Sequence, residues 1–330
     1  MNAVVSPQPN PPRHAEEGAK AAGRGCPADY VYSPKVFARL PDFEAGTLYV
    51  VGGLYGNLAA LDAVEQLAAQ EMAPVTIVFN GDFHWFDAEP DWFAAIERGV
   101  APHRALRGNV ETEIARVMDI GAGCGCDYPP SVSDDVVWRS NVILSQLRAE
   151  APTATRTRLR DLPMYLVAEV AGLRIGIVHG DAEALAGWNF AQGQLDNSHR
   201  GEWRSDIRAA SHIDVFASTH TCLAALRDFV FPVGRLTVIN NGAAGMPNFA
   251  GSRYGLISRI AATPSPHKPL YGLERDGVYI DAIPLKYDNA AFLDRFLARW
   301  TEGSPAHASY YRRIVSGPDY SIAQARPATS

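Results

Sequence analysis

The sequence predicts an α/β protein in which parallel strands alternate with helices in layers. Two apolar runs rich in β-branched residues, "TLYVVGG" (47–53) and "PVTIVFNGD" (74–82), are typical of buried strands, and "HRALRGN" (103–109) predicts a third strand that ends in Gly-Asn. Between them, residues 57–71 place apolar side chains at helical spacing, and residues 91–100 repeat the pattern over a shorter length. Strands and helices that alternate in this order form parallel strand pairs. Side chains with a chemical role are then expected at the carboxyl ends of the strands.

The remaining elements follow from the same pattern of apolar runs that end in polar or small residues. Residues from 120 to about 163 break the alternation with "GAGCGCDYPP" and a charged helix, so we expect an inserted cap segment there. Residues 164–181 predict a hairpin of two strands, and residues 213–220 and 235–245 predict two further strands. A C-terminal helix is expected around residues 289–300.

The limits of the domain are predicted from composition. Residues 1–28 are rich in Pro, Ala, Gly and charge, which predicts a disordered N-terminal tail. One domain is expected over residues 29–316, followed by a flexible C-terminal tail at 317–330. No apolar run has the length of a signal peptide core or of a membrane span, so we expect a cytoplasmic protein without a membrane partner.

Charge and cysteine content narrow the classes of partner. A net charge of -6 argues against binding of nucleic acid, which normally requires a basic surface, but it leaves small anionic substrates open. The four cysteines, Cys26, Cys124, Cys126 and Cys222, are too few and too scattered for a disulfide framework. This favours a reducing compartment, and nothing in the sequence predicts the oligomeric state.

Four polar residues each follow a different predicted strand: Asp82, Asn109, His179 and His220. Side chains at the carboxyl ends of parallel strands meet at one edge of a sheet, so these four predict a metal site. The alternative is structural: Asp82 and Asn109 could cap turns, and His179 and His220 could be ordinary buried histidines.

The strand ends "VVGGLYGN", "FNGDFHWFD", "LRGNVETE", "GIVHGD", "FASTHT" and "INNGAAG" stand in an order and spacing that resemble a known family. Between about residues 47 and 287 the chain resembles the calcineurin-like metallophosphoesterases, and more closely their small single-domain phosphodiesterase-type branch. The resemblance implies a four-layer α/β sandwich with a site for two metals. It places Asp82 as the bridging ligand, Asn109 and His179 on the second metal, and His220 on the first.

The chain departs from the family pattern at several of its polar positions. Gly53 and Tyr55 stand where the family has the Asp and His that bind the first metal. Val110 replaces the histidine that assists the leaving group, and Ala217-Ser218 replace a Gly-His pair that supplies another ligand. The resemblance therefore implies a reduced or rebuilt metal site.

Other residues are candidates for the roles that these replacements leave open. Tyr55 and His84 could replace the missing acid, and Glu111 keeps the carboxylate next to it. The backbone of Gly53 could approach an anion at the start of the following helix. Arg107 and Arg253 could meet a substrate phosphate. Further local substitutes as metal ligands are Asp87, Asp181 and the Cys124-x-Cys126 pair.

We therefore expect a metal-dependent phosphoester hydrolase that acts on a small phosphorylated metabolite. Its cofactor is expected to be one or two divalent ions of Mn, Zn or Fe, since imidazole and carboxylate ligands suit these metals. Two alternatives stay open. One is a catalytically inactive binding or regulatory protein with the same fold, and the other is a single-metal enzyme of another reaction class.

Overall fold

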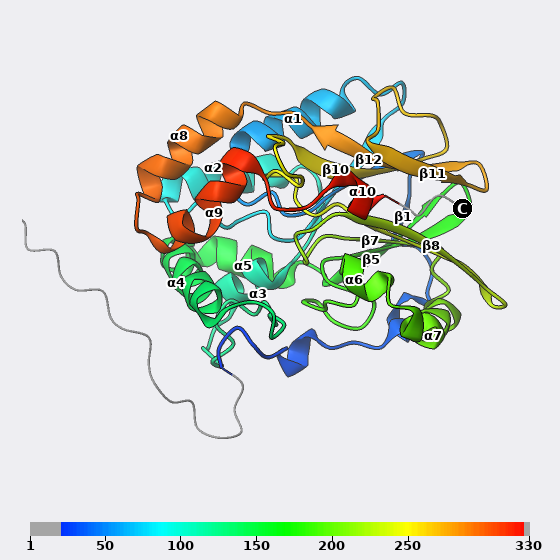
Figure 1. Cartoon of the computed structure of the whole chain (residues 1–330), viewed down its shortest axis with the longest axis horizontal. Helices are drawn as coiled ribbons and strands as arrows, with labels where there is room; N and C mark the ends of the chain where they lie inside the picture. The colour runs from blue at the N-terminus through cyan, green and yellow to red at the C-terminus, as the bar shows by residue number, and fades with distance from the viewer. Residues whose placement is uncertain (1–20, 327–330) are drawn as a thin grey trace, which may run out of the picture.

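The computed structural model describes residues 21–326 and confirms the predicted α/β class. Two sheets of six strands each lie face to face, and helices cover their outer faces, so the molecule has four layers (Figure 1). Predictions for residues 1–20 and 327–330 lie outside the described residues. Within residues 21–326, no helix is both long enough and apolar enough to cross a membrane.

The first sheet contains the three predicted parallel strands of the N-terminal half of the chain. Its strand order is β11-β12-β10-β2-β3-β4, with β2, β3 and β4 parallel and the other pairs antiparallel. Helices on its outer face pack in one cluster with strand side chains. The elements are β2 (Thr47–Val51), β3 (Val75–Asn80), β4 (Arg104–Leu106), β10 (Gly255–Ala261), β11 (Tyr271–Arg275), β12 (Val278–Leu285), α1 (Leu58–Ala68), α2 (Pro90–Val100) and α8 (Asn289–Arg299).

The second sheet contains the predicted hairpin, whose strands β5 and β6 pair antiparallel. Its order is β1-β5-β6-β7-β9-β8, with β6, β7 and β9 parallel. The elements are β1 (Phe43–Glu44), β5 (Tyr165–Val170), β6 (Leu173–Val178), β7 (Val215–Ser218), β8 (Ala225–Phe231), β9 (Gly234–Asn240), α6 (Gln192–Leu195), α7 (Gly201–Ser211) and short 3-10 helices at Ala28–Tyr30, Pro34–Phe37 and Ser198–Arg200.

The core between the sheets explains why the strands are continuous apolar runs. In β2, Leu48 and Val50 pack against Ile175 and Ile177 of the second sheet. Tyr49, on the opposite face of the same strand, packs in the cluster that includes the helices. Strands covered on both faces lose the alternation of polar and apolar residues. Their carboxyl ends are then the places where polar side chains gather.

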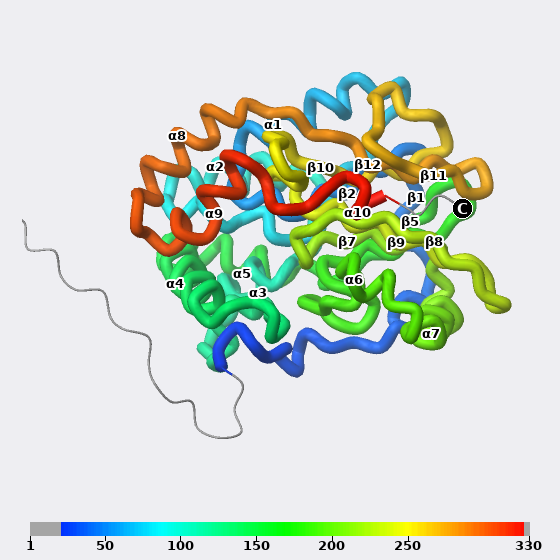
Figure 2. Tube along the Cα trace, viewed as in Figure 1, coloured from blue at the N-terminus to red at the C-terminus, as the bar shows by residue number. Residues whose placement is uncertain are grey.

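The segment predicted as an inserted cap, residues 120–163, forms a loop and two helices, α4 (Asp134–Glu150) and α5 (Thr153–Asp161). Both helices pack against α3 (Asn109–Ala115), which follows β4. Helix α4 also packs against α9 (Pro305–Ser316), so segments far apart in the sequence lie side by side (Figure 2). The segment therefore borders the edge where the parallel strands of the first sheet end, and its limits as a cap stay a prediction.

Residues 21–28, predicted as part of a disordered tail, are packed against the domain. Arg24 donates hydrogen bonds to the carbonyl oxygens of Pro129 and Val132, at 2.7 and 2.6 Å. One arginine that satisfies two loop carbonyls thus orders a stretch whose composition alone predicts disorder.

Residues 317–326, predicted as part of a flexible tail, are likewise packed. Tyr320 is buried, and its hydroxyl donates to the carbonyl oxygen of Ala224 at 2.7 Å. The short helix α10 (Ile322–Ala325) follows and packs against β8. The buried ring of Tyr320 contributes apolar contact area that stabilises the packing of this segment, although the polar composition of the segment predicts flexibility.

Candidate functional site

Asp82 lies where the chain leaves β3, in a turn built from unusual backbone conformations. Gly81 has φ +89° and Asp82 has φ +51°, a left-handed conformation that aspartate tolerates better than most residues. A Cβ at position 81 would lie 2.5 Å from the backbone nitrogen of Gly108, so only glycine fits between the two strand ends. The turn directs the buried carboxylate of Asp82 to the edge of the sheet.

Asn109 is the first residue of α3 and lies beside Asp82. The backbone N–H of Val110, the next residue, donates to Asp82 Oδ1 at 3.3 Å. The Asn109 side chain donates from Nδ2 to the carbonyl oxygen of Cys124 at 2.9 Å. Since the amide nitrogen is turned toward that carbonyl, Asn109 Oδ1 faces the other way, toward the histidines.

The two histidines come from the second sheet, where His179 follows β6 and His220 follows β7. His179 Nδ1 lies 3.0 Å from the carbonyl oxygen of Asn80, and His220 Nε2 lies 3.0 Å from that of Cys126. A carbonyl oxygen only accepts, so each of these nitrogens carries the ring hydrogen. The remaining ring nitrogens, His179 Nε2 and His220 Nδ1, therefore present lone pairs.

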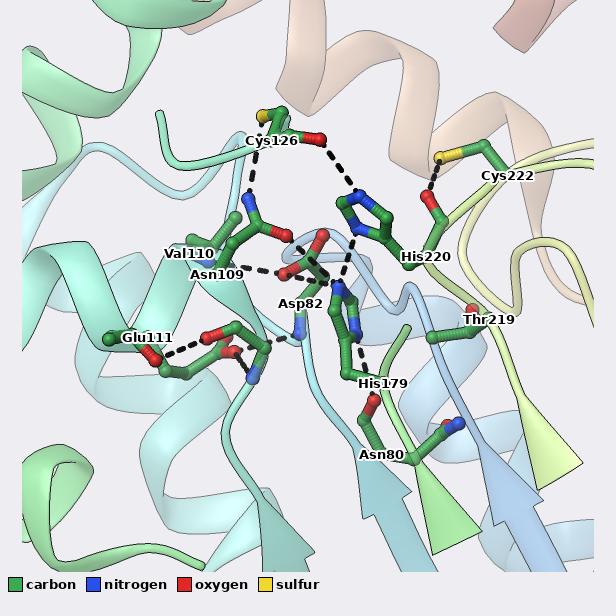
Figure 3. A network of polar contacts seen from close by, with 12 residues as sticks. Asn80, Asp82, Asn109, Val110, Glu111, Cys126, His179, Thr219, His220 and Cys222 are labelled. Atoms are coloured by element: carbon green, nitrogen blue, oxygen red, sulfur yellow. Dashed lines mark hydrogen bonds and ion pairs between the residues drawn. The ribbon is translucent and has the colours of Figure 1, made fainter. Parts of the chain in front are cut away.

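These lone pairs converge (Figure 3). His179 Nε2 is 3.0 Å from His220 Nδ1, 3.0 Å from Asn109 Oδ1 and 3.4 Å from Asp82 Oδ1. Ligand atoms of Asp82, His179 and His220 all lie within 4.8 Å of one another. When Asp82 is ionised, four acceptors thus face one point without a hydrogen between them, an arrangement that a cation stabilises. The four predicted ligands are brought together by the structure.

Burial sets the protonation of these groups. It lowers the pKa of His179 to about 4, and together with the neighbouring His179 it lowers that of His220 to about 3. Burial also raises the pKa of Asp82 to about 7. Both imidazoles are therefore neutral at physiological pH, the form that binds metals, whereas the Asp82 carboxylate needs a nearby positive charge to be stable.

Comparison with known proteins agrees with this geometry. A family model described as calcineurin-like phosphoesterase matches residues 46–239, which is more than half of the chain. The chain belongs to the calcineurin-like phosphoesterase family. This phosphoesterase-family membership supports hydrolysis of phosphoesters and use of divalent metals at the level of the family.

Two solved structures have the same fold as this family member. A hypothetical protein from Pyrococcus horikoshii is 20% identical, with a TM-score of 0.56, and the match covers 83% of this chain and 99% of that one. A metallophosphoesterase from Sphaerobacter thermophilus is 14% identical, with a TM-score of 0.52, and covers 82% of this chain and 100% of its own. A search of curated proteins gave no significant match.

Tyr55 lies beside Asp82, in the wall of the same cavity. A Cβ at Gly53 would lie 2.8 Å from the Tyr55 ring, so the ring needs glycine at position 53. The Tyr55 hydroxyl lies 2.8 Å from Cys222 Sγ. Gly53 and Tyr55 therefore depend on each other, because the aromatic ring of Tyr55 fills the space that a side chain at position 53 would need.

The backbone of Gly53 does not offer the anion site that was predicted. Its N–H donates to the carbonyl oxygen of Gly81 at 3.2 Å, and the N–H of Tyr55 donates to that of Asp82 at 3.1 Å. These amides hold the two loops together instead of facing the cavity. The substrate-binding role of Gly53 is corrected to a structural one.

Glu111, predicted as catalytic, holds the turn of Asp82. Its carboxylate accepts hydrogen bonds from the backbone N–H groups of Asp82 at 2.8 Å, Gly108 at 2.9 Å and His84 at 3.3 Å. Burial, and then the charge of Asp82, raise the pKa of Glu111 to about 7. The oxygens of Glu111 therefore cap α3 and brace the loop that carries Asp82.

His84, also predicted as catalytic, is directed away from Asp82. Its Nδ1 lies 2.6 Å from Asp87 Oδ2 and its Nε2 lies 2.9 Å from Glu97 Oε1. The ring stacks on Phe93 with centroids 3.9 Å apart. Both nitrogens are engaged on the far side of the loop, so the structure does not bring His84 to the site.

A pH-dependent stability is expected from His84. Burial lowers its pKa, but Asp87 and Glu97 outweigh burial and raise it to about 9. The stabilisation is therefore complete below the unfolded value of about 6.5 and is lost as the pH rises through about 9, an effect of about 3 kcal/mol. His84→Gln removes it. Urea denaturation of both proteins at pH 6, 8 and 10 measures this, and parallel pH dependences would contradict the expectation.

The Cys124-x-Cys126 loop contributes carbonyl oxygens to the site. A disulfide joins the two cysteines to each other. The number and spacing of the cysteines argue against a disulfide framework and do not predict this single bond. The carbonyl of Cys124 accepts from Asn109, and that of Cys126 accepts from His220 and from Trp188 Nε1. The carbonyl oxygens of the loop thus orient Asn109 and His220, two of the four candidate ligands.

The two aspartates considered as substitute ligands are used elsewhere. Asp87 holds His84 and accepts the backbone N–H of Trp85, whereas the Asp181 carboxylate accepts three backbone N–H groups of its own loop. Arg107 is likewise engaged by the carbonyl oxygen of Arg160. Arg253 is exposed in the loop before β10.

A cavity of about 180 Å³ opens beside Asp82, Asn109 and His220. Arg313 of α9 lies in its wall, where the guanidinium donates to the carbonyl oxygens of Cys222 and Pro247 at 2.7 and 3.1 Å. Neither predicted arginine, Arg107 nor Arg253, lines it. The sequence gives no signal for Arg313, because it lies on a helix without a motif. The full lining is Tyr55, Asp82, Trp85, Asn109, Val110, Cys126, Tyr128, Val132, Val136, Trp188, His220, Thr221, Cys222, Tyr310 and Arg313.

Proposed function

We propose that the protein is a metal-dependent phosphoester hydrolase that acts on a small phosphorylated molecule with a single divalent ion. The observation that carries the proposal is the convergence of four lone pairs, from Asp82, Asn109, His179 and His220. Tyr55 fills the place of the first-metal ligands, which favours one ion over two. Two imidazoles, a carboxylate and an amide oxygen suit Zn, Mn or Fe.

Asp82, Asn109, His179 and His220 would hold the divalent ion, which would supply Lewis-acid chemistry to the phosphoryl group and to the attacking water. The protein supplies the remaining parts of the site. Arg313 places a fixed positive charge on the cavity wall, where it can pair with a phosphate oxygen. Val110 and the aromatic residues of the wall exclude bulk water, which strengthens these electrostatic contacts. The volume of about 180 Å³ and the acidic net charge favour a small substrate over nucleic acid.

A second candidate function is a binding protein that holds a metal and a phosphorylated ligand without turnover. Val110 favours it, because an apolar side chain lies where a proton donor would assist the leaving group. In this case the same four residues hold the ion, and Arg313 holds the anion.

Metal analysis of the purified protein tests the proposal. After chelation and reloading with Mn or Zn, we expect about one equivalent of metal, since three charged or imidazole ligands and an amide define one site. His179→Gln is expected to lose the metal, whereas His199→Gln, at an exposed histidine, keeps it. Hydrolysis of phenyl phosphate should require the metal. A wild-type protein that takes up no metal contradicts the proposal, and metal without turnover favours the binding protein.

A further inference from the structure

Aromatic side chains form part of the wall of the cavity beside the proposed metal ligands, and one of them contacts His220. The ring of Trp188 meets that of His220 edge to face, with centroids 5.4 Å apart, and the Tyr128 ring lies 6.1 Å from Trp188. On the other side, Trp85 and Tyr310 meet at 6.3 Å. A flat ring in this cavity would contact aromatic faces and edges while its substituent reaches the metal ligands, a favourable arrangement for aromatic groups.

The hydrogens of the polar groups nearest the ligands are directed elsewhere. The Cys222 thiol donates to the carbonyl oxygen of His220 at 3.4 Å, so the Tyr55 hydroxyl gives its hydrogen to Cys222 Sγ at 2.8 Å. The ring hydrogens of His179 and His220 go to the carbonyls of Asn80 and Cys126. None of these four groups has a proton free for a leaving oxygen.

The other lining groups are poor acids. The Tyr128 hydroxyl pairs with Ser140 Oγ at 3.0 Å, and burial raises the pKa of Tyr310 to about 12. Arg313 donates hydrogen bonds but does not lose its proton. In the proposed function Asp82 is ionised as a metal ligand, and no other side chain that lines the cavity in the described part of the chain is both directed inward and acidic enough to protonate an alkoxide near neutral pH.

We infer that the substrate is an aryl phosphate monoester, an inference that rests on the proposed function and names its substrate class. The bond between phosphorus and the aryl oxygen breaks, and its electron pair leaves as a phenolate, while water supplies the new oxygen and both its protons stay on the released dihydrogen phosphate. A phenol has a pKa of about 10 and needs no acid to depart. An alkanol is a far weaker acid than a phenol, close in acidity to water, and does need an acid to depart.

The space around the cavity defines which aryl groups fit. About 180 Å³ accommodates one ring, and Val132 and Val136 supply the apolar sides. A second, open cavity of about 840 Å³ shares Tyr128 and Trp188 with the first. Substituents on the ring can therefore extend past these two side chains toward solvent.

Binding and turnover are measured separately on the full-length, metal-loaded protein. Phenylphosphonate, which is not hydrolysed, is expected to bind at least about tenfold more tightly than methylphosphonate by calorimetry. Tyr128→Ala should remove most of this preference, whereas Tyr311→Ala, at an exposed tyrosine of α9, should not. Phenyl phosphates should be hydrolysed at least about 100-fold faster than alkyl phosphates, with rates that rise as the phenol becomes more acidic.

The outcomes distinguish failure of the proposed substrate class from failure of the proposed hydrolase function. Equal binding of the two phosphonates, or alkyl phosphates hydrolysed as fast as phenyl phosphate, overturns the substrate class and leaves the hydrolase standing. Selective binding of phenylphosphonate without turnover of any ester supports the aryl cavity and overturns the hydrolase. If neither phosphonate binds, the inference is wrong.

Discussion

Asp82→Asn is expected to remove the metal and, at the same time, to stabilise the metal-free protein. The variant loses the only charged ligand of the four, so the loss of metal affinity should exceed the roughly 10–100-fold typical of an outer-sphere partner. Without metal, the wild-type carboxylate is buried with the Val110 N–H as its backbone partner. An asparagine amide keeps an oxygen for this N–H and offers hydrogens to His179 Nε2, which lies 3.4 Å from Asp82 Oδ1.

The gain in stability should depend on pH with a defined sign. Burial raises the pKa of Asp82 from 3.8 to about 7, so the ionised form destabilises the metal-free fold. This penalty is absent below about pH 4, grows as the pH rises, and is complete above about pH 7, where it amounts to about 4 kcal/mol. The free energy of unfolding of the metal-free variant should therefore exceed that of the wild type at pH 8 and match it at pH 4.

Metal analysis and urea denaturation, with and without a chelator, measure both effects. Asp62→Asn, at an exposed aspartate of α1, is the matched control and should change neither. Retention of a full metal equivalent by Asp82→Asn would show that the ion, if any, is bound elsewhere. A variant less stable than the wild type at pH 8 without metal would show that Asp82 is paired by a group other than those described.

The convergence of the four candidate ligands could be predicted from the sequence because each obeys a local rule. Asp82, Asn109, His179 and His220 follow apolar runs directly, and the geometry of parallel strands brings such residues to one edge. Their hydrogen-bond partners could not be predicted in this way. The carbonyl of Cys126 that orients His220 comes from a loop whose path depends on tertiary packing.

The predictions that the structure corrects share a physical cause. His84 is two residues past Asp82, but the chain turns at Gly81 and Asp82, which have left-handed backbone, and the His84 ring lies toward Asp87 and Glu97. Sequence proximity therefore does not imply a shared direction. Arg313 is the opposite case, since it reaches the cavity from α9 through helix packing that no motif records.

Parts of the fold outside the motifs were also missed. Strands β10, β11 and β12 complete the first sheet in antiparallel pairs, and their sequences follow no alternation with helices. The alternation of strands and helices predicts only the parallel half of each sheet. Strand β10 joins β2 by pairing between segments far apart in the sequence, which local patterns do not predict. Strands β11 and β12, in contrast, form a local hairpin through Asp276-Gly277, a turn signal that was not used in predicting the fold from the sequence.

Glu111→Gln is expected to weaken metal binding by about 10–100-fold without abolishing turnover of the loaded protein. The two oxygens of Glu111 accept three backbone N–H groups, from Asp82, His84 and Gly108. Glutamine replaces one oxygen with a donor that faces another donor, so at least one buried N–H loses its partner. We expect a loss of about 2–4 kcal/mol in the free energy of unfolding and a looser turn around Asp82.

The split between affinity and turnover distinguishes a positioning residue from a catalytic one. Glu113→Gln is the matched control, because Glu113 is buried on the same helix but pairs with Tyr30 and Arg116. It should lower stability without changing metal affinity. At saturating metal, Glu111→Gln should keep kcat within about threefold of the wild type, since the ligands themselves are intact. If kcat falls by orders of magnitude while metal affinity is unchanged, Glu111 acts on the substrate, and the catalytic role predicted from its place in the sequence is the correct one.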